Sequence, residues 1–213
     1  MCLIAHRRGR LSDISESGLS DEPPPVTAGR TLPQFDDLPV DVDTASLSHG
    51  TRLHPQCEPL APLVGVWRGE GLAQYPSLLG EFPYGQQITF AHDGRPFLCY
   101  EARSWLLSPS GEVLRPAARE VGWWLVEEDG TLEVLLTHMF GISEIYYGGA
   151  TTETSWELES HIVARTDSAR ETTEAARLYG ILEDGQLAYV EERALRGLPM
   201  QPHLSAQLHR IIG

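Results

Sequence analysis

His203 stands in a segment that could hold a metal, because proline residues fix the backbone just before it. The segment reads LPMQPHLS at residues 198–205, with one proline next to the histidine and another three residues before that proline. Each proline locks its own φ angle, so the imidazole is restricted to a narrow range of directions. A single neutral imidazole is the common proximal ligand of haem iron. The alternative is a histidine that ends the last strand and binds no metal.

A second unusual stretch is GVWRGEG at residues 65–71, followed at 75–76 by Tyr-Pro. Glycines at even spacing fall on one face of a strand, beside Trp67 and without side chains of their own. Such a face lets a flat group or a neighbouring strand come close to the backbone. The alternative interpretation is a bulged first strand of a barrel, in which Trp67 fills the core.

Other catalytic signatures are absent from the sequence. It contains no G-x-S-x-G, H-E-x-x-H or C-x-x-C motif and no glycine-rich dinucleotide loop. Glu191 and Glu192 are adjacent carboxylates, but neighbouring strand residues point to opposite faces, so the two cannot act together. His138 and His161 lie in strand patterns, where a hydrogen-bonded histidine is more common than a metal ligand. Apart from the two stretches above, the sequence therefore carries little sign of catalytic chemistry.

The elements that must position these residues are short strands. Alternating apolar residues predict about ten of them, and turns such as Asp93-Gly94, Asp129-Gly130 and Asp184-Gly185 separate several neighbours. The expected ranges are 63–73, 84–90, 97–107, 121–125, 132–136, 143–147, 156–162, 174–182, 187–193 and 203–212. Strands at this spacing are typical of an antiparallel barrel or sandwich. We predict an all-β fold, an up-and-down barrel like the fatty-acid-binding proteins and lipocalins, because closure removes exposed edges and encloses a small cavity.

The chain divides into three parts by composition. Residues 1–30 are polar, contain Pro23-Pro24-Pro25 and show no helical or strand period, so we predict a disordered tail. Residues 31–58 carry scattered apolar residues between turn formers and are predicted to form a partly ordered arm. Residues 59–213 are predicted to form the barrel.

Charge and cysteine content restrict the partners and the compartment. The net charge is −14, and all 16 basic residues are arginine, so neither nucleic acid nor an anionic membrane is an expected partner. The missing lysines also exclude Schiff-base chemistry. Three cysteines without paired spacing fit a reducing compartment, and no signal peptide or membrane-spanning run of about 18–20 apolar residues is visible. We predict a cytoplasmic protein.

Residues 60–213 resemble the nitrobindin family of small β-barrels that hold a b-type haem. The resemblance is carried by G-x-W-x-G-x-G at 65–71 with Tyr-Pro at 75–76, by Phe-Ala-His at 90–92, and by P-x-x-P-H-L-x-A-x-L around His203. It implies one haem b per chain, with His203 as the axial ligand of the iron.

The same resemblance implies further residues at the haem site. The opening motif of the family runs beside the haem, which places Gly65, Trp67, Gly69 and Gly71 there. Ser77 stands where relatives often have threonine, and it keeps the hydroxyl group. A basic residue some 25 positions before the ligand contacts the haem in relatives, and Arg177 is the match in this sequence.

The function that the resemblance implies is the isomerisation of peroxynitrite to nitrate at a ferric haem, with His203 as the catalytic ligand. The open iron position would also bind nitric oxide reversibly. The alternative is a fatty-acid-binding-like barrel that carries an apolar ligand and no haem. Peroxynitrite and nitric oxide are the expected small-molecule partners, and a homodimer stays open.

Overall fold

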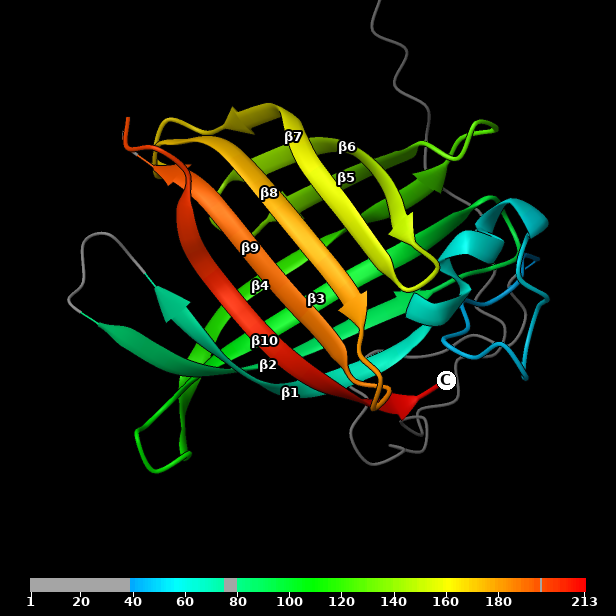
Figure 1. The fold of residues 1–213 in the computed structure, drawn as a ribbon, viewed down its shortest axis with the longest axis horizontal. Helices are drawn as coiled ribbons and strands as arrows, with labels where there is room; N and C mark the ends of the chain where they lie inside the picture. Colours follow the sequence, from blue (N-terminus) through cyan, green and yellow to red (C-terminus); the bar gives the residue numbers. More distant parts are fainter. Residues whose placement is uncertain (1–38, 75–79, 196) are drawn as a thin grey trace, which may run out of the picture. The chain divides into compact units, whose positions relative to one another are not determined.

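The computed structural model describes residues 39–74, 80–195 and 197–213 (Figure 1). Apart from Pro39, these residues belong to one compact unit, Val40–Gly213. The predicted tail at 1–30, part of the predicted arm at 31–58, and Ser77 lie outside the described residues, so these predictions stay untested.

The described residues of this unit form ten antiparallel strands that close into a barrel (Figure 1). Each strand pairs with the next along the chain, and β1 pairs with β10 to complete the circle. The barrel predicted from sequence is confirmed. The strands are β1 (Gly65–Gln74), β2 (Glu81–Ala91), β3 (Phe97–Leu107), β4 (Val113–Val126), β5 (Leu132–His138), β6 (Ile142–Thr152), β7 (Ser155–Arg165), β8 (Thr172–Ile181), β9 (Leu187–Leu195) and β10 (Gln201–Ile212).

Tight turns set the register of the hairpins. Between β4 and β5, the amide of Gly130 donates to the carbonyl of Glu127 at 3.0 Å, and the Asp129 carboxylate accepts from the amide of Thr131 at 2.9 Å. Gly130 has a φ angle of 86°, which favours glycine. Because side chains alternate along each strand, this register turns one apolar set into the barrel.

A 3-10 helix, η1 (Pro55–Leu63), covers the end of the barrel where β1 begins (Figure 1). The indole N–H of Trp67 donates to the carbonyl of Leu63 at 2.7 Å, and that of Trp156 donates to the carbonyl of Pro59 at 3.2 Å. We did not predict this helix from the sequence. Because η1 plugs this end, we call it the closed end and the opposite end the mouth.

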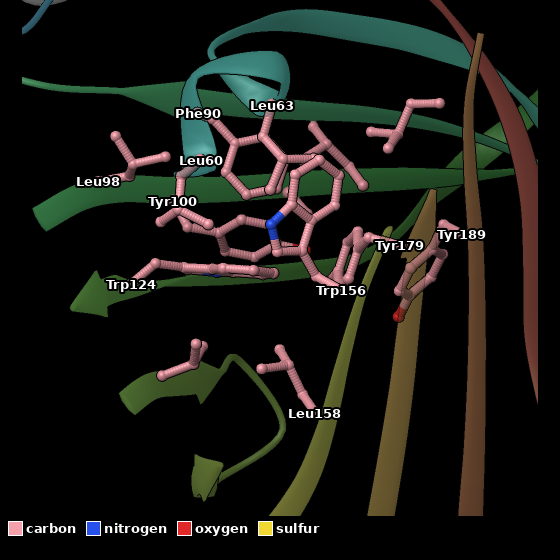
Figure 2. Packing of buried hydrophobic residues seen from close by; sticks show 14 of the residues in the cluster. Leu60, Leu63, Phe90, Leu98, Tyr100, Trp124, Trp156, Leu158, Tyr179 and Tyr189 are labelled. Carbon is pink, nitrogen blue, oxygen red and sulfur yellow. The ribbon is translucent and has the colours of Figure 1, made fainter. Parts of the chain in front are cut away.

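Aromatic side chains fill the half of the barrel beneath η1 (Figure 2). The ring of Phe90 packs edge-on against Tyr100 and Trp124, with centroids 5.2 and 5.3 Å apart. Trp124 in turn meets Tyr179 at 5.0 Å, again edge-on. Offset and edge-on contacts of this kind are the favoured geometry of buried rings. The closed half of the barrel is therefore a packed core.

The segment before η1 is joined to the barrel near its closed end. Thr44 and His92, the residue that follows β2, exchange two backbone hydrogen bonds of 2.8 and 2.9 Å. The imidazole of His92 is fully buried, and burial lowers its pKa, which favours the neutral ring. At least this part of the chain before residue 59 is thus ordered against β2.

Candidate functional site

The mouth of the barrel is formed where β1 ends and β10 begins. Ala73 on β1 pairs with Leu204 on β10, so His203 comes next to Gln74. The register between β9 and β10 shifts between Pro202 and Leu204, which makes His203 the extra residue of a bulge. Bulges redirect a side chain relative to the regular alternation of a strand. His203, directly after Pro202, therefore stands outside the regular pairing of β9 and β10, at the mouth of the barrel.

The environment of His203 favours a neutral imidazole. The Nδ1 atom is buried, although the residue as a whole is half-buried. Burial lowers the pKa of His203, the Glu191 carboxylate acts against this shift, and the guanidinium groups of Arg193 and Arg177 add to it. The backbone of Gln74 also acts to raise the pKa. Because the net direction is downward, His203 carries a lone pair at neutral pH.

Beneath His203 lies a cluster of charged side chains that we call the buried ion cluster. It consists of residues from five strands, all facing the inside of the barrel: Glu120, His138, Glu144, Arg177, Glu191 and Arg193. Burying charge is costly unless each group is paired and hydrogen-bonded. The contacts within the cluster meet that condition.

Arg177 is the centre of the cluster. Its guanidinium binds Glu120 through two parallel hydrogen bonds of 3.0 and 2.9 Å, and its Nε donates to the hydroxyl oxygen of Tyr146 at 3.1 Å. The carboxylates of Glu144 and Glu191 lie 3.8 and 3.5 Å from Nη2. Such paired, charge-assisted bonds are among the strongest in proteins.

Arg193 and His138 complete the pairing of the carboxylates. Arg193 donates to Glu144 at 2.8 Å and also binds Glu191 through Nε. His138 lies between two carboxylates, with Nε2 2.7 Å from Glu144 and Nδ1 3.1 Å from Glu120. The expectation that His138 is a hydrogen-bonded strand residue is therefore confirmed.

The cluster shifts the pKa values of its carboxylates strongly. Burial alone would raise the pKa of Glu144, but the hydrogen bond from His138 and the charges of Arg193 and Arg177 lower it to about 2. Burial opposes ionisation of Glu120 and Glu191 as well, yet the Arg177 charge lowers both pKa values. The three carboxylates are thus ionised at neutral pH, and their negative charges are paired with the guanidinium groups of the two arginines.

The structure separates the residues that the sequence grouped around a haem. Arg177 is fully buried within the cluster, so its guanidinium is directed at carboxylates in the barrel interior. Trp67 is fully buried beneath η1, and Arg210 stacks over its ring at 4.3 Å. Trp67 precedes Gln74 by seven residues of β1, roughly 23 Å along the strand. Gly65 and Trp67 thus lie at the closed end, whereas His203 lies at the mouth.

The glycines of β1 allow two strands to approach closely. A Cβ atom on Gly69 would lie 2.1 Å from the carbonyl oxygen of Gln207, and one on Gly71 would lie 2.0 Å from that of Ser205. Both oxygens belong to β10, so the bare face of β1 is met by the neighbouring strand. A bulge between Val66 and Trp67 also fits the alternative interpretation of this motif. Gly71 and Gly69 are the members of the motif nearer to the mouth.

Sequence reasoning missed most of the buried ion cluster. Glu120, Glu144 and Arg193 were not singled out, and Glu191 was noted only because its side chain faces away from that of Glu192; Glu191 is buried and Glu192 exposed. The available signal was the alternation of side chains along a strand. Glu120 lies an even number of positions before the apolar residues Trp124 and Val126, so it shares their inward face.

The donor set at the mouth suits a cofactor that brings most of its own ligands. Within the described residues, no group of three or more His, Cys, Asp or Glu side chains is arranged to hold a metal ion. A haem needs one axial ligand from the protein, since the porphyrin supplies the other four nitrogens. A half-buried, neutral His203 fits that requirement.

A closed antiparallel barrel that presents a neutral imidazole at its mouth is the architecture of a small ligand-binding barrel. Residues 56–210 match the family described as the THAP4-like, heme-binding beta-barrel domain, and the chain belongs to this family. The sequence resemblance to the nitrobindin family is therefore confirmed.

Similar proteins cover most of the chain. A ferric nitrobindin-like protein of Saccharopolyspora erythraea is 52% identical over 88% of each chain. A protein of Rhodococcus jostii named peroxynitrite isomerase 2 is 44% identical over 88% of this chain and 92% of its own. The crystal structure of Rv2717c from M. tuberculosis matches with a TM-score of 0.65 at 35% identity, over 74% of this chain and 98% of that one.

Proposed function

We propose that the protein is a haem-dependent peroxynitrite isomerase that binds one haem b per chain through His203. The family match supports haem binding, and the names of several relatives support the reaction. The observation that carries the assignment is the neutral imidazole in a bulge at the mouth of the barrel. Haem held in this way would supply an iron site for peroxynitrite and for reversible binding of nitric oxide.

The parts played by the protein follow from the geometry. Bound haem would supply the iron centre at which peroxynitrite is converted to nitrate. His203 presents its lone pair, and the adjoining Pro202 limits how far the ring can turn. Arg177 acts from within the buried ion cluster, where its charge helps to keep His203 neutral. Gly69 and Gly71 contribute by letting β1 pair closely with β10, the strand that carries His203.

The other residues of the predicted site have less direct parts. Ser77 remains a proposed haem contact on the strength of the resemblance. Gly65 and Trp67 are proposed to have a structural part. They lie at the closed end of the barrel, where the buried indole of Trp67 binds the carbonyl of Leu63 in η1. The fatty-acid-binding alternative is less well supported, since aromatic rings fill one half of the barrel interior and charged pairs occupy the other.

The test is the substitution His203→Ala, with His209→Ala as a matched control. His209 lies on the same strand but is exposed and pairs with Arg68. We expect His203→Ala to fold, yet to lose the Soret band of a histidine-ligated ferric haem, the spectral change on adding nitric oxide and the catalysed decay of peroxynitrite. The control should keep all three. If His203→Ala keeps the Soret spectrum of the parent, His203 is not the ligand.

Two further proposals concern the state of the protein in the cell. Within the described residues Cys57 and Cys99 are both free thiols, which supports a reducing compartment and the cytoplasm. No helix among those residues is long and apolar enough to cross a membrane. We also propose that the chain associates with a second copy to form a homodimer.

A further inference from the structure

Glu191 is the carboxylate of the buried ion cluster that lies on the strand next to His203. It belongs to β9, which pairs with β10 (Figure 1). The bulge residue His203 falls between Leu204, which pairs with Glu191, and Pro202, which pairs with Glu192. The other two carboxylates of the cluster come from β4 and β6, and neither of these strands pairs with β10. Because opposed and diagonal positions of paired strands lie within reach of long side chains, Glu191 is the cluster carboxylate placed to act on His203.

The side chain of Glu191 is fixed inside the barrel. The residue is buried, and its neighbours on the inner face of β9 both donate to its carboxylate, Tyr189 through the hydroxyl group and Arg193 through Nε. The Nη2 atom of Arg177 lies 3.5 Å away on the other side. Glu192, the next residue, faces the outside of the barrel and is exposed. Two adjacent carboxylates on one strand thus lie in opposite environments.

Glu191 retains more negative charge than the other carboxylates of the cluster, because two arginines face three glutamates. Both terminal nitrogens of Arg177 donate to Glu120, and both of those of Arg193 donate to Glu144. Paired bonds of this kind neutralise a carboxylate most effectively. Glu191 receives the Nε of Arg193 and an uncharged hydroxyl group instead. The excess negative charge therefore lies on the side of the cluster that is nearest to His203.

We propose that the charge of Glu191 holds iron bound through His203 in the ferric state. This inference rests on the proposed haem binding and deepens it. Reduction adds one electron to the iron, so the ferric state carries the greater positive charge, and a buried negative charge nearby favours it. Groups behind an axial ligand are among the means by which a protein sets the potential of a haem.

The field of Glu191 reaches the imidazole. Burial lowers the pKa of His203, and the Glu191 carboxylate is the strongest of the influences that raise it. A unit charge still changes an equilibrium more than about tenfold at a separation of about 10 Å, if the effective dielectric constant is about 20. Charges on the surface act less, because water and salt screen them. The net charge of −14 therefore does not replace one carboxylate inside the barrel.

The proposed reaction gives this charge a purpose. Peroxynitrite would be converted at ferric haem, whereas the free thiols of Cys57 and Cys99 fit a compartment in which reductants are abundant. Iron without a negative charge nearby would be reduced more readily there. Glu191 would thus keep more of the protein in the state that the reaction uses.

The test is a spectroelectrochemical titration of the haem-loaded full chain, in which Glu191→Gln is compared with Glu192→Gln. The two variants remove the same charge from adjacent positions of β9, one inside the barrel and one outside. At a fixed potential we expect the ratio of ferrous to ferric protein to be at least about tenfold higher in Glu191→Gln than in the parent, which is about 59 mV for one electron. Glu192→Gln should stay within about twofold of the parent.

A change of opposite sign separates charge from packing. Arg193 is buried and pairs with Gln201, two residues before His203. Arg193→Gln removes a positive charge from the same region, so the ratio of ferrous to ferric protein should fall about tenfold. Damage to packing alone would shift both variants in one direction, and that result would overturn the role of charge. Circular dichroism shows which variants fold, and if Glu191→Gln does not, the sign of the shift in Arg193→Gln decides.

The titration also distinguishes failure of this inference from failure of the proposed function. A parent chain without a Soret band that depends on His203 would overturn the haem site and the role of Glu191 with it. A parent chain that binds haem through His203, together with a Glu191→Gln variant that titrates like Glu192→Gln, would overturn the role of Glu191 alone.

Discussion

Replacing Arg177 with methionine should destabilise the barrel severely, because it leaves buried carboxylates without their shared partner. The Arg177 guanidinium is fully buried and makes two hydrogen bonds to Glu120, one to Tyr146 and a longer one of 3.4 Å to Tyr179. Breaking a buried ion pair on one side costs about 3–5 kcal/mol. In a domain of this size each kcal/mol shifts the midpoint by about 2–4 °C, so we expect Tm to fall by about 6–20 °C.

The assay is thermal unfolding of the haem-free chain, followed by circular dichroism, with a surface arginine as the comparison. Arg165 and Glu171 form an exposed pair at 3.7 Å, and Arg165→Met should cost at most about 1 kcal/mol. Adding Glu120→Gln to Arg177→Met should restore part of the loss, since it removes one of the uncompensated charges. If the Tm of Arg177→Met lies within about 4 °C of that of Arg165→Met, the buried ion cluster does not stabilise the barrel as its geometry indicates.

Two further predictions concern acid sensitivity and the glycines of β1. The folded pKa of Glu144, about 2, lies below its ordinary value of 4.5, so the stability it contributes is present above pH 4.5 and is lost as the pH falls towards 2. That contribution is about 3 kcal/mol. Urea unfolding should therefore show that the free energy of unfolding changes less between pH 6 and pH 3 in Glu144→Gln than it does in the parent. Gly69→Ala should cost at least about 2 kcal/mol in urea unfolding, because its Cβ would overlap the carbonyl oxygen of Gln207 on β10; an unchanged midpoint would show that the strands separate freely.

The strands could be predicted because their signals are local. Alternating apolar residues and glycine turns such as Gly130 lie within a few positions of one another, and both depend on backbone geometry alone. The first part of β4 was missed, since all four side chains from Val113 to Pro116 are exposed and show no alternation. Helix η1 was missed for a similar reason: Pro59 and Pro62 interrupt any helical period in its sequence.

The buried ion cluster could not be predicted in the same way, because its contacts depend on closure of the barrel. Parity along a strand places Glu120 inside, but its partner Arg177 is 57 residues away and on β8, which does not pair with β4. Only the complete circle of strands brings the two side chains together across the interior. His203 is different, because its immediate sequence already marked it, and the structure adds the bulge and the lowered pKa.

The division of the barrel along its axis explains where a cofactor bound through His203 would lie. A barrel of this circumference has more interior volume than eight strands enclose, and short side chains alone would leave it empty. Near the closed end, aromatic rings such as Trp124 and Tyr179 fill the space, and nearer the mouth long arginine and glutamate side chains meet across it. Both halves are thus occupied beneath His203. In the proposed arrangement His203 would therefore hold the haem at the mouth, where small ligands would reach it from solvent, and the buried ion cluster lies below this histidine.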